Sequence, residues 1–229
     1  LVDDLGVHFD ATQPSRMEQR IQQPLTPAQH NRARELQQRW CSQRLSKLNP
    51  ARESPAPAEL FVLVVDQSAG DCSIGLGQAG PESFRRMLQE ALRDQPDCLA
   101  VVKVHPDVIR GRARGHFRRQ DLQHPRIRIC ADGLHPAALL EQAQAVYVVT
   151  SQMGFEALLW GRTVHCFGMP FYAGWGLTRD RLSAPVRRGQ MVPLEALVHA
   201  ALVAGTRCVD PHHHQPCLLY TSPSPRDGD

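Results

Sequence analysis

The chain has 229 residues, a net charge of +3 and a charged fraction of 21%, so it can bury a substantial core, and its charge does not indicate nucleic-acid binding. No apolar run approaches the ~20 residues of a membrane-spanning helix, and no signal peptide opens the sequence. The seven cysteines are odd in number and contain no CxxC pair, which favours reduced thiols in a cytosolic protein over a disulfide framework or a zinc site.

The predicted elements begin with two helices in residues 17–48, where Leu and Ile recur at helical spacings and Thr26-Pro27 is a typical helix start. A Pro- and Ala-rich linker follows at residues 49–59. We then expect strands at residues 60–65, 98–104, 126–130, 145–149 and 163–167, and helices at 82–93, 136–144, 154–160 and 194–204. This alternation predicts an α/β fold with a doubly wound parallel sheet, Rossmann-like, after an N-terminal helical part.

Residues 145–178 predict a buried strand, a helix start, a second strand and a loop rich in Gly and aromatic residues. Thr150 and Ser151 can cap the helix, and Gly154 keeps its first turn free of bulk, so that unpaired backbone N–H groups point at a bound anion. Glu156 follows about one and a half turns later, where its carboxylate can accept bonds from two ribose hydroxyls. The layout is typical of a nucleotide site.

Polar residues follow several of the predicted strands. Asp66 and Asp71 come after the first strand, His105 after the second, and Thr150 and Ser151 after the fourth. Ligands of open α/β sheets bind outside the carboxyl ends of the strands, so we expect these residues to form one site.

Several segments resemble one family. They are TSQMGFEALLWGR and FGMPFYAGWGL in residues 150–177, VDDLGVHFDATQPS at 2–15, VLVVDQSAGDCS at 62–73 and VKVHPDV at 102–108. Taken in their order along the chain, these segments are similar to the capsule polysaccharide β-Kdo transferases of the KpsC type, which move Kdo from CMP-Kdo onto a lipid acceptor in Gram-negative bacteria. The resemblance covers residues 1–211.

The resemblance implies the donor-binding half of a retaining β-Kdo glycosyltransferase of the GT-B type. It implies that Asp71 is the nucleophile, whereas Asp71 read by itself is an aspartate that stabilises its own turn. Asp66 is the alternative nucleophile. The implied substrate-binding residues are Lys103, His105, Thr150 and Ser151 for the phosphate, Glu156 for the ribose, and Gly154, Gln67 and Ser73.

The same resemblance implies CMP-Kdo as the donor substrate, no cofactor and no metal. Expected partners are a lipid acceptor at the inner membrane and other capsule assembly proteins, without nucleic acid, and the expected location is cytoplasmic and peripheral at the inner membrane. The chain starts without Met and inside a family motif, so we expect a fragment that is inactive alone. The expected divisions are a helical remnant at 1–52, a CMP-sugar-binding domain at 53–211, and a non-native disordered tail at 212–229, which contains CLLYTSPSPRD.

Three features have competing interpretations. The GxGxxG at residues 75–80 begins ten residues after Val65, too far from the strand for a dinucleotide-binding turn, and we interpret it as a flexible loop. The basic run GRARGHFRR at residues 111–119, preceded by Arg110, is either a solvated loop or a contact with an anionic surface. Tyr172 and Trp175 either stack on the ligand or wedge their loop against the helices.

Two rival functions remain open from the residues. One is a metal-dependent hydrolase that uses Asp66, Asp71 and His105. The other is a non-catalytic nucleotide-binding interaction module, which would bind CMP without transferring a sugar.

Overall fold

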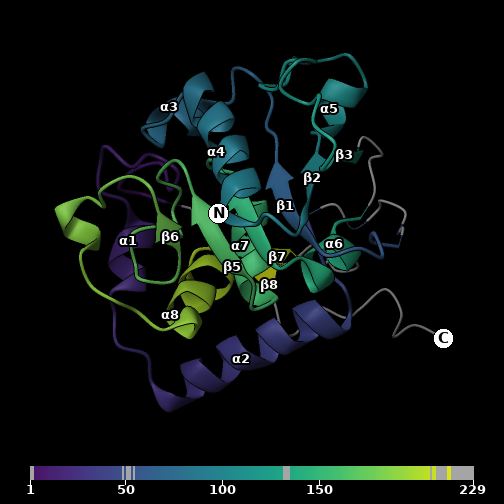
Figure 1. The fold of residues 1–229 in the computed structure, drawn as a ribbon. Coiled ribbons are helices and arrows are strands. Elements are labelled where there is room, and N and C mark those ends of the chain that lie inside the picture. Colours follow the sequence, from purple (N-terminus) through teal and green to yellow (C-terminus); the bar gives the residue numbers. More distant parts are fainter. Residues whose placement is uncertain are drawn as a thin grey trace.

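The computed structural model describes residues 3–47, 49, 53, 55–130 and 135–206, and the backbone of residues 208–209 and 216–217. Its centre is a parallel sheet of six strands in the order β3-β2-β1-β4-β5-β6 (Figure 1). The strands are β1 (Phe61–Val65), β2 (Leu99–Lys103), β3 (Ile127–Cys130), β4 (Ala145–Val148), β5 (Thr163–Cys166) and β6 (Arg179–Asp180). The sheet confirms the predicted doubly wound fold, and its order reverses between β1 and β4, where such sheets bind ligands.

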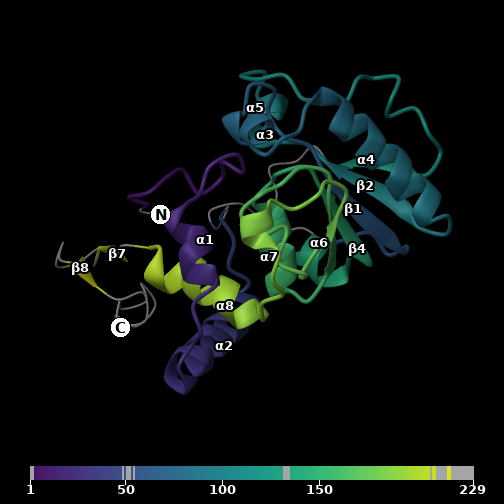
Figure 2. The same ribbon diagram turned by 90° about the vertical axis from the view of Figure 1, so that its left-hand side faces the viewer.

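Different helices cover the two faces of the sheet, because successive side chains of a strand point to opposite faces. Leu63 of β1 lies in one apolar core with α6 (Ala137–Gln142) and α7 (Met153–Leu159). Val64 lies in a second core with α4 (Pro81–Asp94). Figure 2 shows α4 on one side of the sheet and α6 and α7 on the other. Burial on both faces explains why the sequence of β1 is apolar throughout.

The two predicted N-terminal helices are present as α1 (Arg16–Ile21) and α2 (Pro27–Ser42), and each begins with a capping box. Both helices pack against α8 (Leu194–Val198) and the π-helical turn η2 (His199–Ala204). Apolar side chains of α1, among them Met17, belong to the same core as α6 and α7. The N-terminal helices therefore share a core with the sheet, and the predicted boundary at 52/53 stays a prediction.

The structure contains short elements that the sequence analysis assigned to loops. They are α3 (Cys72–Leu76), α5 (Pro106–Ile109), the two-residue strand β6 and the 3₁₀ turn η1 (Val186–Arg188). The sequence did not predict α3, because Gly75 disfavours the interior of a helix; Gly77 is the C-cap at which α3 ends. Gly77 is needed there, since a Cβ atom would lie 2.5 Å from the Thr150 methyl group. The last predicted helix, 194–204, is α-helical only to Val198.

Of the tail at residues 212–229, the structure describes only the backbone of β8 (Pro216–Cys217), which pairs antiparallel with β7 (Cys208–Val209). The rest of the tail lies outside the described residues. Within the described part of the chain, no helix has the length and apolar character needed to cross a membrane.

A buried ion pair joins α1 to η1, the 3₁₀ turn that follows β6. Arg188 has no exposed surface, and its Nε donates to Glu18 Oε1 at 2.5 Å. The Arg188 Nη1 atom donates to the Pro170 carbonyl at 2.7 Å, and Arg187 Nε donates to Glu18 Oε2 at 2.8 Å. Burial lowers the pKa of Arg188, and the bond to Glu18 opposes that shift. Glu18 therefore compensates a cation that has no access to water.

Candidate functional site

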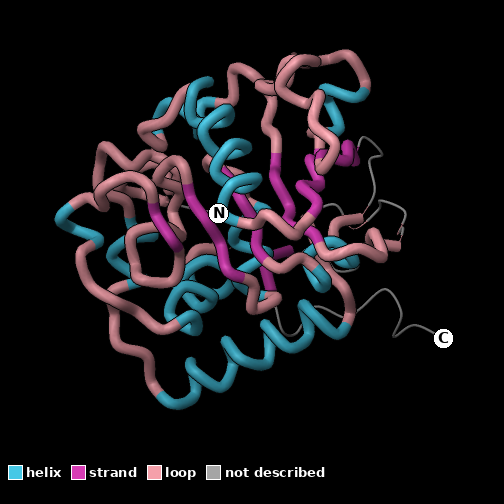
Figure 3. The backbone as a smooth tube through the Cα atoms, viewed as in Figure 1, coloured by secondary structure: helices cyan, strands magenta, loops and turns pink. Residues whose placement is uncertain are grey.

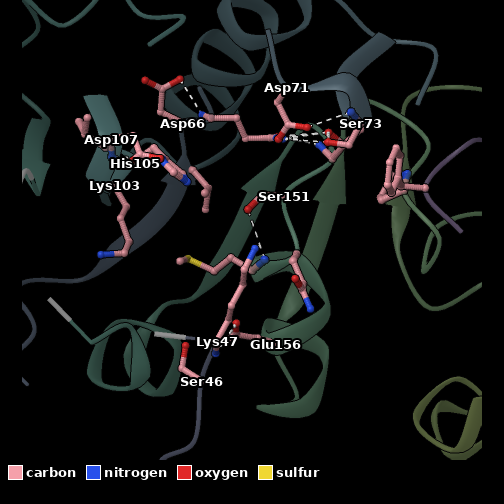
Figure 4. Close-up of a pocket in the computed structure, with 18 of the residues that line it drawn as sticks. Ser46, Lys47, Asp66, Asp71, Ser73, Lys103, His105, Asp107, Ser151 and Glu156 are labelled. Atoms are coloured by element: carbon pink, nitrogen blue, oxygen red, sulfur yellow. Dashed lines mark hydrogen bonds and ion pairs between the residues drawn. The ribbon is translucent and has the colours of Figure 1, made fainter. Parts of the chain in front are cut away.

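A cavity of about 730 Å³ lies at the carboxyl ends of β1, β2 and β4, where the strand order reverses. At this end of the sheet a loop follows β1, and β2 is followed by α5 and then by the long loop that leads to β3 (Figure 3). The predicted site residues that line the cavity are Asp66, Gln67, Asp71, Ser73, Lys103, His105, Thr150, Ser151 and Glu156 (Figure 4). Residues far apart in the sequence are thus gathered around one space, as the strand-end rule predicts.

Gln67 connects the ends of β1 and β4. Its Oε1 accepts the Thr150 backbone N–H at 2.9 Å, and its Nε2 donates to Thr150 Oγ1 at 3.0 Å and to Asp71 Oδ2 at 3.2 Å. The backbone N–H can only donate, which fixes the orientation of the amide. Ser73 Oγ lies 3.1 Å from Thr150 Oγ1 and completes the network. Gln67, Ser73 and Thr150 therefore hold Asp71 in place.

Asp71 is the N-cap of α3, and its Oδ1 accepts the Ser73 N–H at 2.9 Å. The residue is exposed at the cavity wall. Burial raises the pKa of Asp71, but hydrogen bonds from Ser73 and Gln67 and the charge of Lys47 outweigh it, so the pKa lies below its ordinary value. Asp71 is consequently ionised at neutral pH, as a carboxylate nucleophile must be.

Asp66 has a different environment. It is 4% exposed, and its Oδ1 accepts the backbone N–H groups of Gln67 at 2.9 Å and His116 at 3.1 Å. Burial raises the pKa of Asp66, and these backbone hydrogen bonds only partly offset that rise. A Cβ atom on Gly115 would lie 2.3 Å from Asp66 Oδ2, so the loop passes close over the carboxylate. Both carboxylates line the cavity, but Asp66 is buried and anchors the loop that contains Gly115 and His116, whereas Asp71 is exposed.

Lys103 and His105 line the cavity from the end of β2, and Lys103 is 2% exposed. The Nδ1 atom of His105 accepts the Asp107 backbone N–H at 3.2 Å and lies 3.1 Å from Ser68 Oγ. Because a backbone N–H only donates, neutral His105 carries its proton on Nε2. The imidazole can therefore donate a hydrogen bond to an anion through Nε2.

At the start of α7, Ser151 lies at the cavity as predicted, but Gly154 does not. Ser151 lines the cavity, and its Oγ accepts the Met153 N–H at 3.3 Å. Gly154 does not line the cavity, and a Cβ atom there would lie 2.3 Å from the Tyr172 hydroxyl. Gly154 thus makes room for a buried tyrosine, which donates a hydrogen bond to the Ser151 carbonyl.

Tyr172 and Trp175 are fully buried. The Trp175 Nε1 atom donates to the Phe171 carbonyl at 2.9 Å. Tyr172 and Trp175 therefore do not offer a ring face to a ligand; they pack their loop against the rest of the fold.

Glu156 is 3% exposed at the base of the cavity, and its Oε1 accepts the Lys47 backbone N–H at 3.3 Å. Its Oε2 atom has no hydrogen-bond partner among the described residues. Burial raises the pKa of Glu156, while a hydrogen bond from Ser46 and the charges of Lys47 and Lys103 oppose the shift. A buried carboxylate oxygen without a partner is costly, and a ligand hydroxyl would satisfy it.

Sequence reasoning missed several lining residues. Ser46 and Lys47 come from the segment after α2, and Figure 4 shows both beside Glu156. His8, Phe9 and Arg110 also line the cavity. No local pattern marks Ser46 and Lys47, because the tertiary fold alone brings their segment to the strand ends. His8 and Phe9 lie in the family motif at residues 2–15 and Arg110 adjoins the basic run, but neither pattern predicts a place in this cavity.

In the part of the chain that the structure describes, no group of three or more His, Cys, Asp or Glu side chains is arranged to hold a metal ion.

A family profile described as "Capsule polysaccharide biosynthesis protein" matches residues 17–206. The capsule polysaccharide modification protein LipA of Neisseria meningitidis serogroup A is 41% identical over 189 residues, which are 78% of this chain and 27% of that protein. The lipopolysaccharide-processing protein LpsZ of Rhizobium meliloti is 33% identical over 91% of this chain and 49% of its own length. The chain thus spans less than half of either relative.

Two solved structures from Thermosulfurimonas dismutans share the fold. The KpsC β-Kdo 2,4 transferase aligns with a TM-score of 0.89 and 37% identity over 96% of this chain and 70% of its own. The KpsC β-Kdo 2,7 transferase aligns with a TM-score of 0.77 and 28% identity over 94% of this chain and 68% of its own. Together with the match over residues 17–206, these similarities show that the chain belongs to the capsule polysaccharide biosynthesis protein family.

Proposed function

We propose that this chain is the donor-binding part of a retaining β-Kdo glycosyltransferase of the GT-B type. It would move Kdo from CMP-Kdo to a lipid-linked acceptor in capsule polysaccharide biosynthesis and export. The observation that carries the proposal is that one cavity brings together three features. They are the ionised carboxylate of Asp71, the side chains of Lys103 and His105 at the end of β2, and the buried Oε2 atom of Glu156, which has no hydrogen-bond partner among the described residues. The similarity to two Kdo transferases supports the choice of sugar.

In the proposed reaction, an Asp71 oxygen attacks C2 of Kdo, the bond from C2 to the phosphate oxygen breaks, and CMP leaves with the bonding electrons. An acceptor hydroxyl then attacks the same carbon, and Asp71 leaves as a carboxylate. The proton of the acceptor hydroxyl passes to water. Each displacement inverts C2, so the two together retain its configuration. Gln67 and Ser73 hold the carboxylate in place through the contacts described above.

The nucleotide would lie between the end of β2 and the start of α7. Lys103 and the Nε2 proton of His105 would neutralise the phosphate as CMP leaves, which lowers the barrier most in a site shielded from water. Ser151, which lines the cavity, would donate its hydroxyl to the phosphate, while Thr150 would act by positioning Gln67. The free Oε2 atom of Glu156 would accept hydrogen bonds from the ribose.

If Lys103 and His105 bind the phosphate of CMP, changing either residue should weaken the binding of CMP but not of cytidine. In Lys103→Met and His105→Ala variants, we expect CMP to bind roughly tenfold to a hundredfold more weakly, the loss of one charge-assisted bond. Cytidine, which lacks the phosphate, should bind nearly as before. Titration calorimetry with both ligands measures the difference, and His124→Ala, an exposed histidine outside the cavity, is the control. Equal losses for CMP and cytidine would mean that the two residues only support the fold.

The function itself is tested with a chain extended to the length of its relatives. Incubation with CMP-Kdo and a lipid-linked acceptor should give a product heavier by one Kdo unit. We propose that the protein acts at the cytoplasmic face of the inner membrane. CMP binding without any product would favour the nucleotide-binding module instead. Activity that requires a tightly bound divalent ion, detected by metal analysis of the purified protein, would favour the hydrolase.

A further inference from the structure

A second cavity lies at the opposite end of the sheet from the candidate functional site. Its volume is about 360 Å³, and it lies at the amino ends of β4 and β5, beside β6 and the C-terminal end of α4. Among the side chains that line it are those of Asp94, Gln95, Thr163, His165, Arg179 and Arg181. None of these residues lines the first cavity, the one at the candidate functional site, so the proposed reaction gives them no role.

The alternation of side chains along the strands builds the second cavity. Thr163 and His165 of β5 point to one face of the sheet, while Val164 between them lies in the apolar core on the other face. Arg179 of β6 pairs in register with His165, and Arg181 follows two positions later on the same face. On this face α4 packs mainly against β1, β2 and β4. The polar side chains of β5 and β6 therefore line a cavity at the edge of α4.

His165 supplies a hydrogen-bond donor there. The residue is 8% exposed, and its ring stacks on Tyr147 with the centroids 4.3 Å apart. Its Nδ1 atom lies 3.4 Å from Arg181 Nη2, and because a guanidinium only donates, Nδ1 accepts and Nε2 carries the proton. Burial, together with the charges of Arg181 and Arg179, lowers the pKa of His165 to about 4, so the ring is neutral at pH 7. The Nε2–H group has no acceptor among the described residues.

Positive charge exceeds negative charge around the second cavity. The charged side chains of α4 and residues 179–181 that gather on this face are Arg86, Arg93, Arg179, Arg181, Glu90 and Asp94. Glu90 is shared between Arg86 at 2.7 Å and Arg181 at 2.5 Å. Arg179 is exposed and forms no ion pair or hydrogen bond with any described residue. Four guanidinium groups around two carboxylates leave a surplus of positive charge that a dianion would balance.

We propose that the second cavity binds a hydroxylated phosphate monoester of the size of a sugar phosphate. The phosphate would accept hydrogen bonds from the Arg179 guanidinium, the His165 Nε2–H and the Thr163 hydroxyl. A phosphate monoester carries about two negative charges at neutral pH, which matches the surplus. The cavity is larger than a phosphate group needs, and Asp94 and Gln95 would bind hydroxyl groups of the remaining part of the ligand.

The test uses glucose 6-phosphate as the probe and glucose as its uncharged counterpart. The chain is first saturated with CMP, so that the first cavity is occupied. Calorimetry should then show saturable binding of one glucose 6-phosphate per chain and no binding of glucose. Arg179→Ser should lower the affinity about tenfold, the loss of one charge-assisted bond, and Thr163→Val, which removes only a hydroxyl, about threefold. Both side chains are exposed, so the fold should persist.

Arg112→Ser is the matched control. Arg112 belongs to the basic run at residues 111–119, is exposed and lines neither cavity, so this variant should bind glucose 6-phosphate within about twofold of wild type. No binding by the wild-type chain, or equal losses in Arg179→Ser and Arg112→Ser, would overturn the inference. A probe that CMP displaces, with normal affinity in Arg179→Ser, would also overturn it, because the probe would then occupy the first cavity.

CMP titration of the same samples keeps this inference separate from the proposed function. Arg179→Ser should leave CMP affinity unchanged, because Arg179 does not line the first cavity. A folded wild-type chain that binds glucose 6-phosphate but not CMP would contradict the proposed function and leave the second cavity supported. The reverse result would contradict the second cavity alone.

Discussion

Replacing Asp71 with Asn in a chain of full family length should lower Kdo transfer by at least about a thousandfold, because the amide cannot attack C2 to form the covalent intermediate. The fold should persist, since Asn is as good an N-cap for α3 as Asp. CMP affinity should stay within about fivefold, because the contacts proposed for the nucleotide come from other residues. A product assay and CMP calorimetry on the same preparation measure both effects.

Asp66→Asn is the matched comparison for that experiment. The Asp66 carboxylate accepts two backbone N–H groups through Oδ1, and an Asn side-chain oxygen can still accept them. We therefore expect measurable transfer in Asp66→Asn. Near-normal turnover in Asp71→Asn together with an inactive Asp66→Asn would reverse the assignment of the nucleophile.

The second large effect concerns stability and comes from Glu18. Glu18→Ala leaves the fully buried Arg188 without its carboxylate and should lower the free energy of unfolding by about 3–5 kcal/mol, the usual cost of breaking a buried ion pair from one side. The change should appear as a lower denaturation midpoint in urea. Asp4→Ala is the control, because Asp4 pairs with Arg16 at the surface, where ion pairs contribute little. Equal midpoints for the two variants would show that the Arg188 cation finds another partner.

Much of the sheet could be predicted from the sequence. Short runs rich in β-branched residues mark the strands, and their alternation with helical segments predicts a parallel sheet. The sequence does not contain the strand order, which depends on how the crossover connections pack. The helix α3 was also hard to predict, because local propensity disfavours a helix that contains Gly75 and ends at Gly77, and α3 depends on its aspartate cap and on tertiary contacts.

The candidate site was predictable only in part. Lys103 ends a strand, and Gln67, His105 and Thr150 come just after strands, so the topology of a parallel sheet brings these residues together. Lys47 reaches the cavity from the segment after α2, and no periodicity or motif points to that approach. The reason for Gly154 was also hidden, since it depends on a tyrosine 18 positions later that packs directly over it.

A calorimetric titration of this chain with CMP decides whether these residues form a nucleotide site. The residues proposed to hold the nucleotide all lie in the described part of the chain, so we predict saturable binding of one CMP per chain, with weaker binding of cytidine. Absence of CMP binding in a sample whose circular dichroism shows a folded α/β protein would mean that this cavity is not a nucleotide site.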